Sequence, residues 1–189
     1  MYRLWSRSSL MALVFIALGS VALVVSFLFV SHQNTAQASP ATTVTLAPVG
    51  DVRAGEPIRL RLVVTGARNL AGFQAAVAFD SPQARVLDAA AVEGLRGSGR
   101  GMLRFGPVLR ENAVIFGAAT CPVEDCSTAQ YRSATRKPLG VNGRVELGEV
   151  VLDIAVPGRY NVRIDDVKLV DPQGNVLPAA STNLMLDVR

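Results

Sequence analysis

The stretch Leu70-Ala-Gly-Phe-Gln-Ala-Ala-Val-Ala-Phe-Asp80-Ser-Pro-Gln-Ala-Arg-Val-Leu-Asp88 decides the fold class of this 189-residue chain. Its first half alternates bulky residues with small or polar ones, as a half-buried β-strand does. The alternation predicts two opposite faces: Phe73, Ala75, Val77 and Phe79 toward a core, and Gln74, Ala76 and Ala78 away from it. Asp-Ser-Pro is a turn signal, so a second strand is expected after it.

Similar runs recur along most of the chain, separated by Gly, Pro, Asn and Asp. They cover residues 42–46, 58–65, 72–79, 85–89, 102–105, 114–118, 145–154, 159–164, 167–170 and 184–188. Short strands at this spacing predict an all-β sandwich, and residues 42–189 have the length of one domain. Half of the residues are hydrophobic but only 6% are aromatic, so the core is expected to be mainly aliphatic.

The same alternation assigns side chains on the other strands. We expect these to point inward: Leu103, Phe105, Val114, Phe116, Tyr160, Val162 and Ile164. We expect these to point outward: Met102, Arg104, Ile115, Asn161 and Arg163. A slip of one residue would bury Arg or Gln, so the register should be well specified.

An uncharged apolar run, Leu10–Val30, precedes the domain. As a helix rising about 1.5 Å per residue, it matches a hydrocarbon core of about 30 Å. Arg3 and Arg7 precede it, so the positive-inside rule predicts that the remainder is exported. Residues 1–30 are therefore a signal anchor that holds the protein at the cell surface, or a signal peptide, with secretion after cleavage at Ala38. The polar residues 31–41 are expected to be a flexible tether.

Cys121 and Cys126 are the only cysteines, and an exported pair so close in sequence is expected to form a disulfide. A metal site is disfavoured because the sole histidine, His32, lies beside the apolar run. Residues 119–143 lack clear alternation, and Ser127–Ala134 within them could form a short helix. The Gly-rich segment Glu93–Gly101 lacks the Lys-Ser/Thr of a phosphate-binding loop and is expected to be a flexible connection.

Composition argues against several functions. The net charge of +4 is dispersed, whereas nucleic-acid binding needs a clustered basic surface. An exported domain without histidine or a free thiol lacks the commonest general base and the strongest nucleophile, so we do not expect an enzyme. Its carboxylates lie at strand ends and turns, where Asp is favoured for local hydrogen bonds. For the oxygen-rich set Asp165, Asp166, Asp171 and Asn175, a structural turn is favoured over a calcium site.

The order of these segments resembles the cohesin family. The opening stretch, with its Gly-Phe strand and aromatic-Asp turn, is followed by Leu147-Gly-Glu-Val-Val-Leu-Asp-Ile154, Gly158-Arg-Tyr-Asn-Val-Arg-Ile164 and Lys168-Leu-Val-Asp-Pro-Gln-Gly-Asn-Val176. The resemblance spans roughly Thr42 to Val188, although the Cys-Pro-Val-Glu-Asp-Cys loop departs from the family pattern. It implies a nine-stranded jelly-roll β-sandwich, here preceded by one N-terminal transmembrane or signal helix.

The resemblance also implies a function. Cohesins are non-catalytic receptors, so the chain is expected to capture a dockerin-like protein, with calcium carried by the partner and no cofactor or metal here. The implied partner-binding residues are Gln74, Ala76, Ala78, Met102, Arg104, Ile115, Asn161 and Arg163. A carbohydrate-binding sandwich that holds polysaccharide, and a generic surface or adhesion domain, stay open as alternatives. Sugar binding is less favoured because only Tyr131 among the exported aromatics is expected to be exposed.

Overall fold

The computed structural model describes residues 42–122, 126 and 139–189, which lie within the unit Pro40–Arg189. In this described part, no helix is long and apolar enough to cross a membrane. The predicted span Leu10–Val30, the expected tether 31–41 and the expected helix Ser127–Ala134 lie outside the described residues.

The described residues form eleven strands and one short 3-10 helix. The strands are β1 (Thr43–Val49), β2 (Ile58–Leu70), β3 (Gly72–Phe79), β4 (Ala84–Ala91), β5 (Gly101–Arg110), β6 (Ala113–Cys121), β7 (Val141–Ile154), β8 (Gly158–Val170), β9 (Val176–Leu177), β10 (Ala180–Thr182) and β11 (Leu184–Val188). The 3-10 helix, η1, spans Glu93–Ser98 between β4 and β5.

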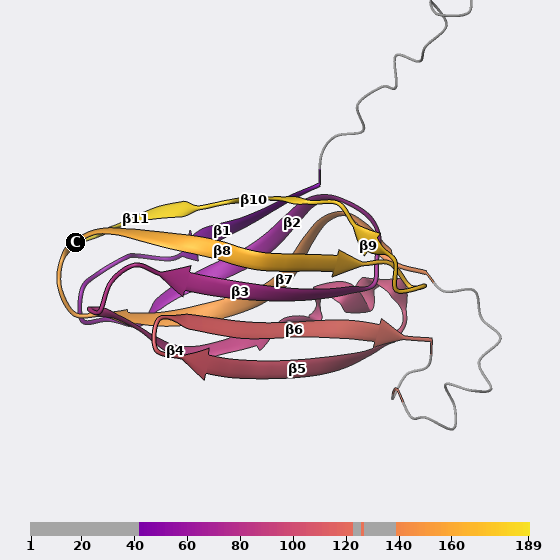
Figure 1. Ribbon diagram of the computed structural model, residues 1–189, viewed down its shortest axis with the longest axis horizontal. Helices are drawn as coiled ribbons and strands as arrows, with labels where there is room; N and C mark the ends of the chain where they lie inside the picture. The colour runs from indigo at the N-terminus through magenta and orange to yellow at the C-terminus, as the bar shows by residue number, and fades with distance from the viewer. Residues whose placement is uncertain (1–41, 123–125, 127–138) are drawn as a thin grey trace, which may run out of the picture. The chain divides into compact units, whose positions relative to one another are not determined.

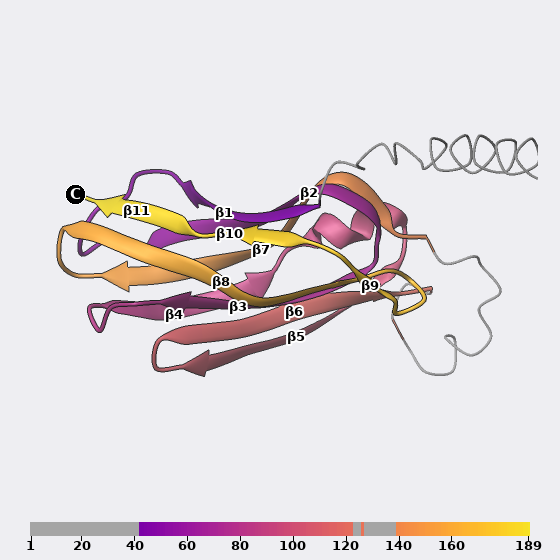
Figure 2. The same cartoon turned by 45° about the horizontal axis from the view of Figure 1, so that its top comes forward.

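Two sheets make up the domain, and Figures 1 and 2 show one layered on the other. The five-stranded sheet has the order β10-β1-β2-β7-β4. The six-stranded sheet has the order β11-β8-β3-β6-β5, and the short β9 pairs with β8. The predicted all-β sandwich is confirmed. The ten sequence runs correspond to the nine longer strands, because residues 159–164 and 167–170 join into β8. The short strands β9 and β10 were not predicted.

The core lies between the sheets and is mainly aliphatic, as expected. The predicted inward residues of β3, β6 and β8 are all buried, with the ring of Phe79 only 1% exposed. Phe73 and Phe116 meet edge to face, with ring centroids 5.9 Å apart. Leu60, Leu62 and Leu152 supply the opposite layer from β2 and β7.

The Gly-rich segment is not a flexible connection. Residues 93–98 form η1, whose Leu95 is fully buried in the core. Gly94 lies so close to the carbonyl of Glu146 on β7 that a side chain would clash with it. Glycine at residue 94 therefore permits close packing of the helix on the sheet, whereas composition alone suggested mobility.

The expected disulfide is confirmed: Cys121, the last residue of β6, is bonded to Cys126, with their Cα atoms 5.4 Å apart.

The prediction for β5 was wrong. Leu103 and Phe105, expected in the core, are 60% and 41% exposed, while Met102 packs against the core. The pairing with β6 explains the inversion, because Arg104 lies opposite the inward Ala118, and neighbours on paired strands share a face. β5 is an edge strand, so the guanidinium of Arg104 leaves the sandwich at its side, donating to the carbonyl of Ala91 and pairing with Glu93.

Candidate functional site

The outer face of the six-stranded sheet is the candidate site, and strand registers define its rows. In the order β8, β3, β6, β5, the rows are Arg163, Ala78, Ala113 and Arg110; Asp165, Ala76, Ile115 and Val108; Lys168, Gln74, Gly117 and Phe105; and Val170, Gly72, Ala119 and Leu103. Charge is concentrated on β8. Small and apolar residues dominate the other three strands.

An apolar band therefore runs along β3, β6 and β5 on this face. We define it by its largest contributors, Ala76, Ile115, Leu103, Phe105 and Val108. The three β5 residues are 41% to 60% exposed. Large apolar side chains clustered on one surface, rather than scattered singly, mark an interaction site.

Small residues at the centre keep the band flat. Gly117 on β6 has no room for a side chain because the ring of Phe105 and the carbonyl of Phe73 occupy the space. Gly72 on β3 is similarly confined by Val170 and Ala119. With the ring of Phe105 lying against the sheet, the surface offers area to another macromolecule rather than an enclosed cavity.

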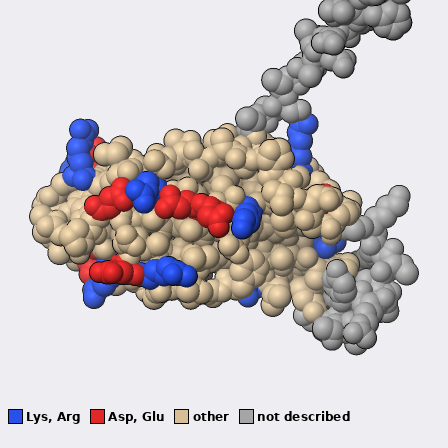
Figure 3. Space-filling model, viewed as in Figure 1, with Lys and Arg blue, Asp and Glu red and all other residues tan. Residues whose placement is uncertain are grey.

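The β8 border is charged and held by internal ion pairs. Asp80, at the end of β3, accepts two hydrogen bonds from Nη1 of Arg163, at 2.6 and 2.8 Å, and one from Asn161 at 3.3 Å. Asp165 lies 3.5 Å from the same guanidinium, and Lys168 lies 3.7 Å from Asp166. Figure 3 shows this row of charges along β8 beside a surface over β3 and the adjoining part of β6 that carries none.

The structure brings most of the sequence-predicted residues together. Gln74, Ala76, Ala78, Ile115, Asn161 and Arg163 all lie on this outer face. Ala78 is only 5% exposed, since it lies between Ala113 and the long side chain of Arg163. Met102 and Arg104 do not belong to the face, because β5 has the opposite orientation.

Sequence reasoning missed the band on β5 and part of the charged border. Leu103 and Phe105 were assigned to the core, and the strand was ended before Val108. Gly106 and Pro107 suggested that ending, but they lie at a bulge within the strand, between Phe105 and Val108. A Gly-Pro pair within an edge strand is compatible with a bulge. This pair was therefore the sequence signal that could have extended the predicted strand to Val108.

The outer face of the five-stranded sheet is different in kind. The acidic residues on that face of β7 pair with arginines on the neighbouring strands: Arg59 lies 2.7 Å from Glu149, Arg85 lies 2.7 Å from Asp153, and Arg61 lies 3.3 Å from Glu146. Such a ladder of exposed ion pairs is a solvated surface. Between the two outer faces, the six-stranded sheet is the one that exposes contiguous apolar area.

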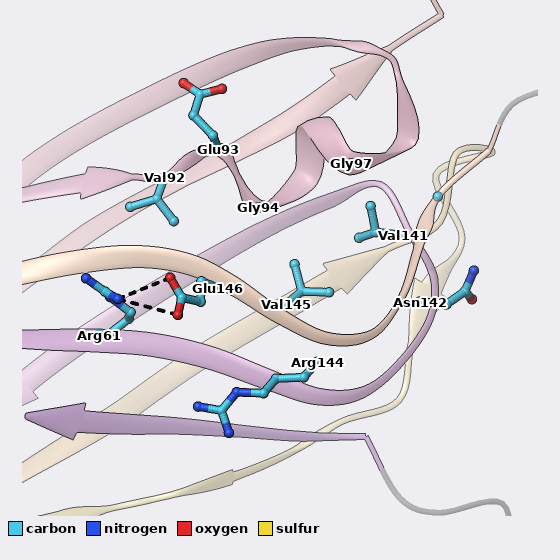
Figure 4. A pocket seen from close by; sticks show the side chains of 11 residues that line it. Arg61, Val92, Glu93, Gly94, Gly97, Val141, Asn142, Arg144, Val145 and Glu146 are labelled. Carbon is cyan, nitrogen blue, oxygen red and sulfur yellow. Dashed lines mark hydrogen bonds and ion pairs between the residues drawn. The ribbon is translucent and has the colours of Figure 1, made fainter.

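A groove of about 800 Å³ lies between η1 and β7. Figure 4 shows Arg61 and Glu146 directed toward each other along it. Glu93, also on its lining, pairs with Arg96 and Arg104. Small-ligand sites are mostly apolar with a few unengaged polar groups, so this charged groove is a weaker candidate than the apolar band.

The oxygen-rich hairpin after β8 is a turn. The carboxylate of Asp171 accepts hydrogen bonds from the backbone of Gln173 and Asn175 and from Nδ2 of Asn175, at 2.8 to 2.9 Å. The bond from the Asn175 side chain is the main cause that lowers the pKa of Asp171. In the described residues no three His, Cys, Asp or Glu side chains gather in a way that could hold a metal. The carboxylate oxygens thus already have local donors, which supports the turn over a calcium site.

Comparison with known proteins finds similarity in fold but not in sequence. No family model matches the sequence, and no curated protein matches it. A cohesin module from a family 33 glycoside hydrolase of Clostridium perfringens superposes with a TM-score of 0.59 at 8% identity, over 79% of this chain and 97% of that one. A non-cellulosomal cohesin from Archaeoglobus fulgidus gives 0.55 at 12% identity, over 79% and 91%.

A structure of a type I cohesin–dockerin complex from Clostridium thermocellum gives a TM-score of 0.56 at 10% identity, over 79% of this chain and 94% of that one. Identities this low support a similarity of fold alone. Any partner of this chain must be inferred from its surface. The sandwich described above therefore has a cohesin-like fold.

Proposed function

We propose that this protein is a non-catalytic binding module of cohesin type that captures a dockerin-like protein through the outer face of its six-stranded sheet. The observation that carries the proposal is the apolar band, with Leu103, Phe105 and Val108 exposed together beside Ile115. A flat apolar centre with a polar border is the composition of protein interfaces. Structures with the same fold include cohesin–dockerin complexes.

Protein binding is favoured over sugar binding by the aromatic residues. Of the described aromatic side chains, Phe73, Phe79, Phe116 and Tyr160 are buried. Phe105 is the exposed one, and it lies on the sheet among aliphatic neighbours. A sugar platform needs several aromatic faces presented to the ligand, which this part of the chain does not offer.

The proposal includes export to the cell surface. The Cys121–Cys126 disulfide supports an oxidising compartment, and the Leu10–Val30 run supplies the targeting signal. Mass spectrometry of the native protein should find an intact amino terminus in the membrane fraction or one beginning near Ser39. Full-length protein recovered from the cytosol would contradict export.

The test is capture of purified dockerin modules by the domain, with calcium or with chelator, measured by calorimetry. Ile115→Asp and Ala76→Asp should each abolish capture, because binding would bury an unpaired carboxylate in the band. Val151→Asp is the matched control, since Val151 is a half-buried residue on the outer face of the other sheet.

Calcium should be required by the dockerin, so chelation should abolish capture while leaving the melting temperature of this domain unchanged. Capture that survives both Asp variants, once both are shown to be folded, would place the recognition surface elsewhere.

A further inference from the structure

The outer face between β8 and β5 has room for one α-helix. β8 and β5 are three strands apart in the sheet order, which at about 4.8 Å per strand is about 14 Å. An α-helix with its side chains is about 10 to 12 Å across. A single helix lying along the strands would therefore cover the centre of the band and place one flank beside β8.

The charges of β8 alternate along that flank. Arg163, Asp165 and Lys168 occupy three consecutive rows of the outer face, in the order cation, anion, cation. The bulge at Asp166, which has a positive φ of 42°, lets Lys168 take the third row. Successive rows on one face are about 6.6 Å apart, close to the rise of about 6 Å over four residues of a helix.

These side chains reach solvent, and their ion pairs within the sheet partly fix them in place. Their exposed fractions are 37% for Arg163, 49% for Asp165 and 59% for Lys168. The two hydrogen bonds from Nη1 to the Asp80 carboxylate orient the Arg163 guanidinium before any partner arrives. Ordering before binding reduces the entropy that complex formation costs.

We propose that this face recognises a helix by a charge code on one flank: an apolar ridge over the band, with an acid, a base and an acid at positions i, i+4 and i+8 facing Arg163, Asp165 and Lys168. This inference rests on the proposed function and names the chemistry of the partner element. On the opposite flank the helix meets Leu103, Phe105 and Val108, so that side is apolar or uncharged. Complementary charges of this kind select partners and fix register more than they add affinity.

Two synthetic helical peptides test the code. Both carry the same leucine ridge and a glutamine flank, and they differ only in the other flank, which reads Glu, Lys, Glu in one and Lys, Glu, Lys in the other. Fluorescence anisotropy with the purified domain should show the first peptide binding about tenfold more tightly, since three exposed pairs change from attractive to repulsive. The preference should fade in 1 M salt, where the screening length is about 3 Å.

A charge-reversal variant makes the test specific to β8. Asp165→Lys/Lys168→Glu should remove or invert the preference between the peptides. Arg59→Glu/Glu149→Arg exchanges an ion pair on the other sheet and should leave the preference unchanged.

Equal affinities for the two peptides, or no binding of either, would overturn the charge code. The proposed function is judged separately by dockerin capture and its loss in Ile115→Asp, so it would survive either of those results.

Discussion

The ring of Phe105 lies directly on Gly117, its partner across the β5–β6 pair, and fills the space that a Cβ at residue 117 would need. The carbonyl of Phe73 on β3 closes the same space from the other side. One glycine thus lets three strands approach while an aromatic ring is laid flat on the outer face. The apolar band depends on this contact, because the ring would otherwise be lifted from the sheet.

Gly117→Ala should therefore destabilise the domain by about 1 to 3 kcal/mol, as overpacking against fixed backbone does. Gly97→Ala on η1 is the control, because a Cβ there would meet Val141 at an ordinary 3.6 Å. Chemical denaturation of both variants measures the difference. If the two variants are equally stable, Phe105 does not lie on Gly117 in solution.

Two phenylalanines that the sequence treats alike should respond differently to truncation. Phe79→Ala should cost about 3 to 5 kcal/mol, since the ring is buried in the core and leaves a cavity. Phe105→Ala and Gln74→Ala, both on the outer face, should cost less than about 1 kcal/mol. Similar losses of stability in the two phenylalanine variants would indicate that Phe105 points into the core, as the alternation suggested.

The fate of β5 shows what alternation can and cannot predict. On β3 the two faces differ sharply, with Phe73, Val77 and Phe79 against Gln74 and two alanines, so only one orientation buries bulk. In Met102-Leu-Arg-Phe105 both faces hold a large apolar residue. The charge of Arg104 suggested that Met102 and Arg104 point outward. At a sheet edge, however, a long cationic side chain reaches solvent from the inner side. Strand position in the sheet, which a single sequence does not contain, determined the outcome.

The candidate face was partly predictable for the same reason. Residues on the central strands β3, β6 and β8 were assigned correctly because both sides of those strands are paired and one face must be buried. Leu103, Phe105 and Val108 were missed because the hydrophobic rule sends apolar residues to the core. A binding surface is where that rule fails, since its apolar area is buried by another molecule.

The disulfide should stabilise its loop without being essential to the fold. The Cys121→Ser/Cys126→Ser variant has no covalent loop in its unfolded chain. Its free energy of unfolding should therefore fall by about 2 kcal/mol, the value expected for so short a loop. The double variant should still fold, with a lower melting temperature that matches the wild type under reducing conditions. Failure of the variant to fold would show that the bond holds more than the end of β6.

The turn after β8 should respond to acid through Asp171. Hydrogen bonds from Asn175, with support from Gln173 and Gly174, favour the carboxylate and hold the pKa of Asp171 below its ordinary value. Because the folded state lowers that pKa, the turn gains stability above the unfolded value of about 4, and this gain is lost as the pH falls through the lower folded value. Titration of the Asp171 carboxyl by NMR should show the lowered midpoint.

Asn175→Ala removes the side-chain donor that contributes most, so it should move the pKa of Asp171 upward toward the ordinary value and make the turn less sensitive to acid. A midpoint that stays the same in Asn175→Ala would mean that the backbone donors alone set this pKa.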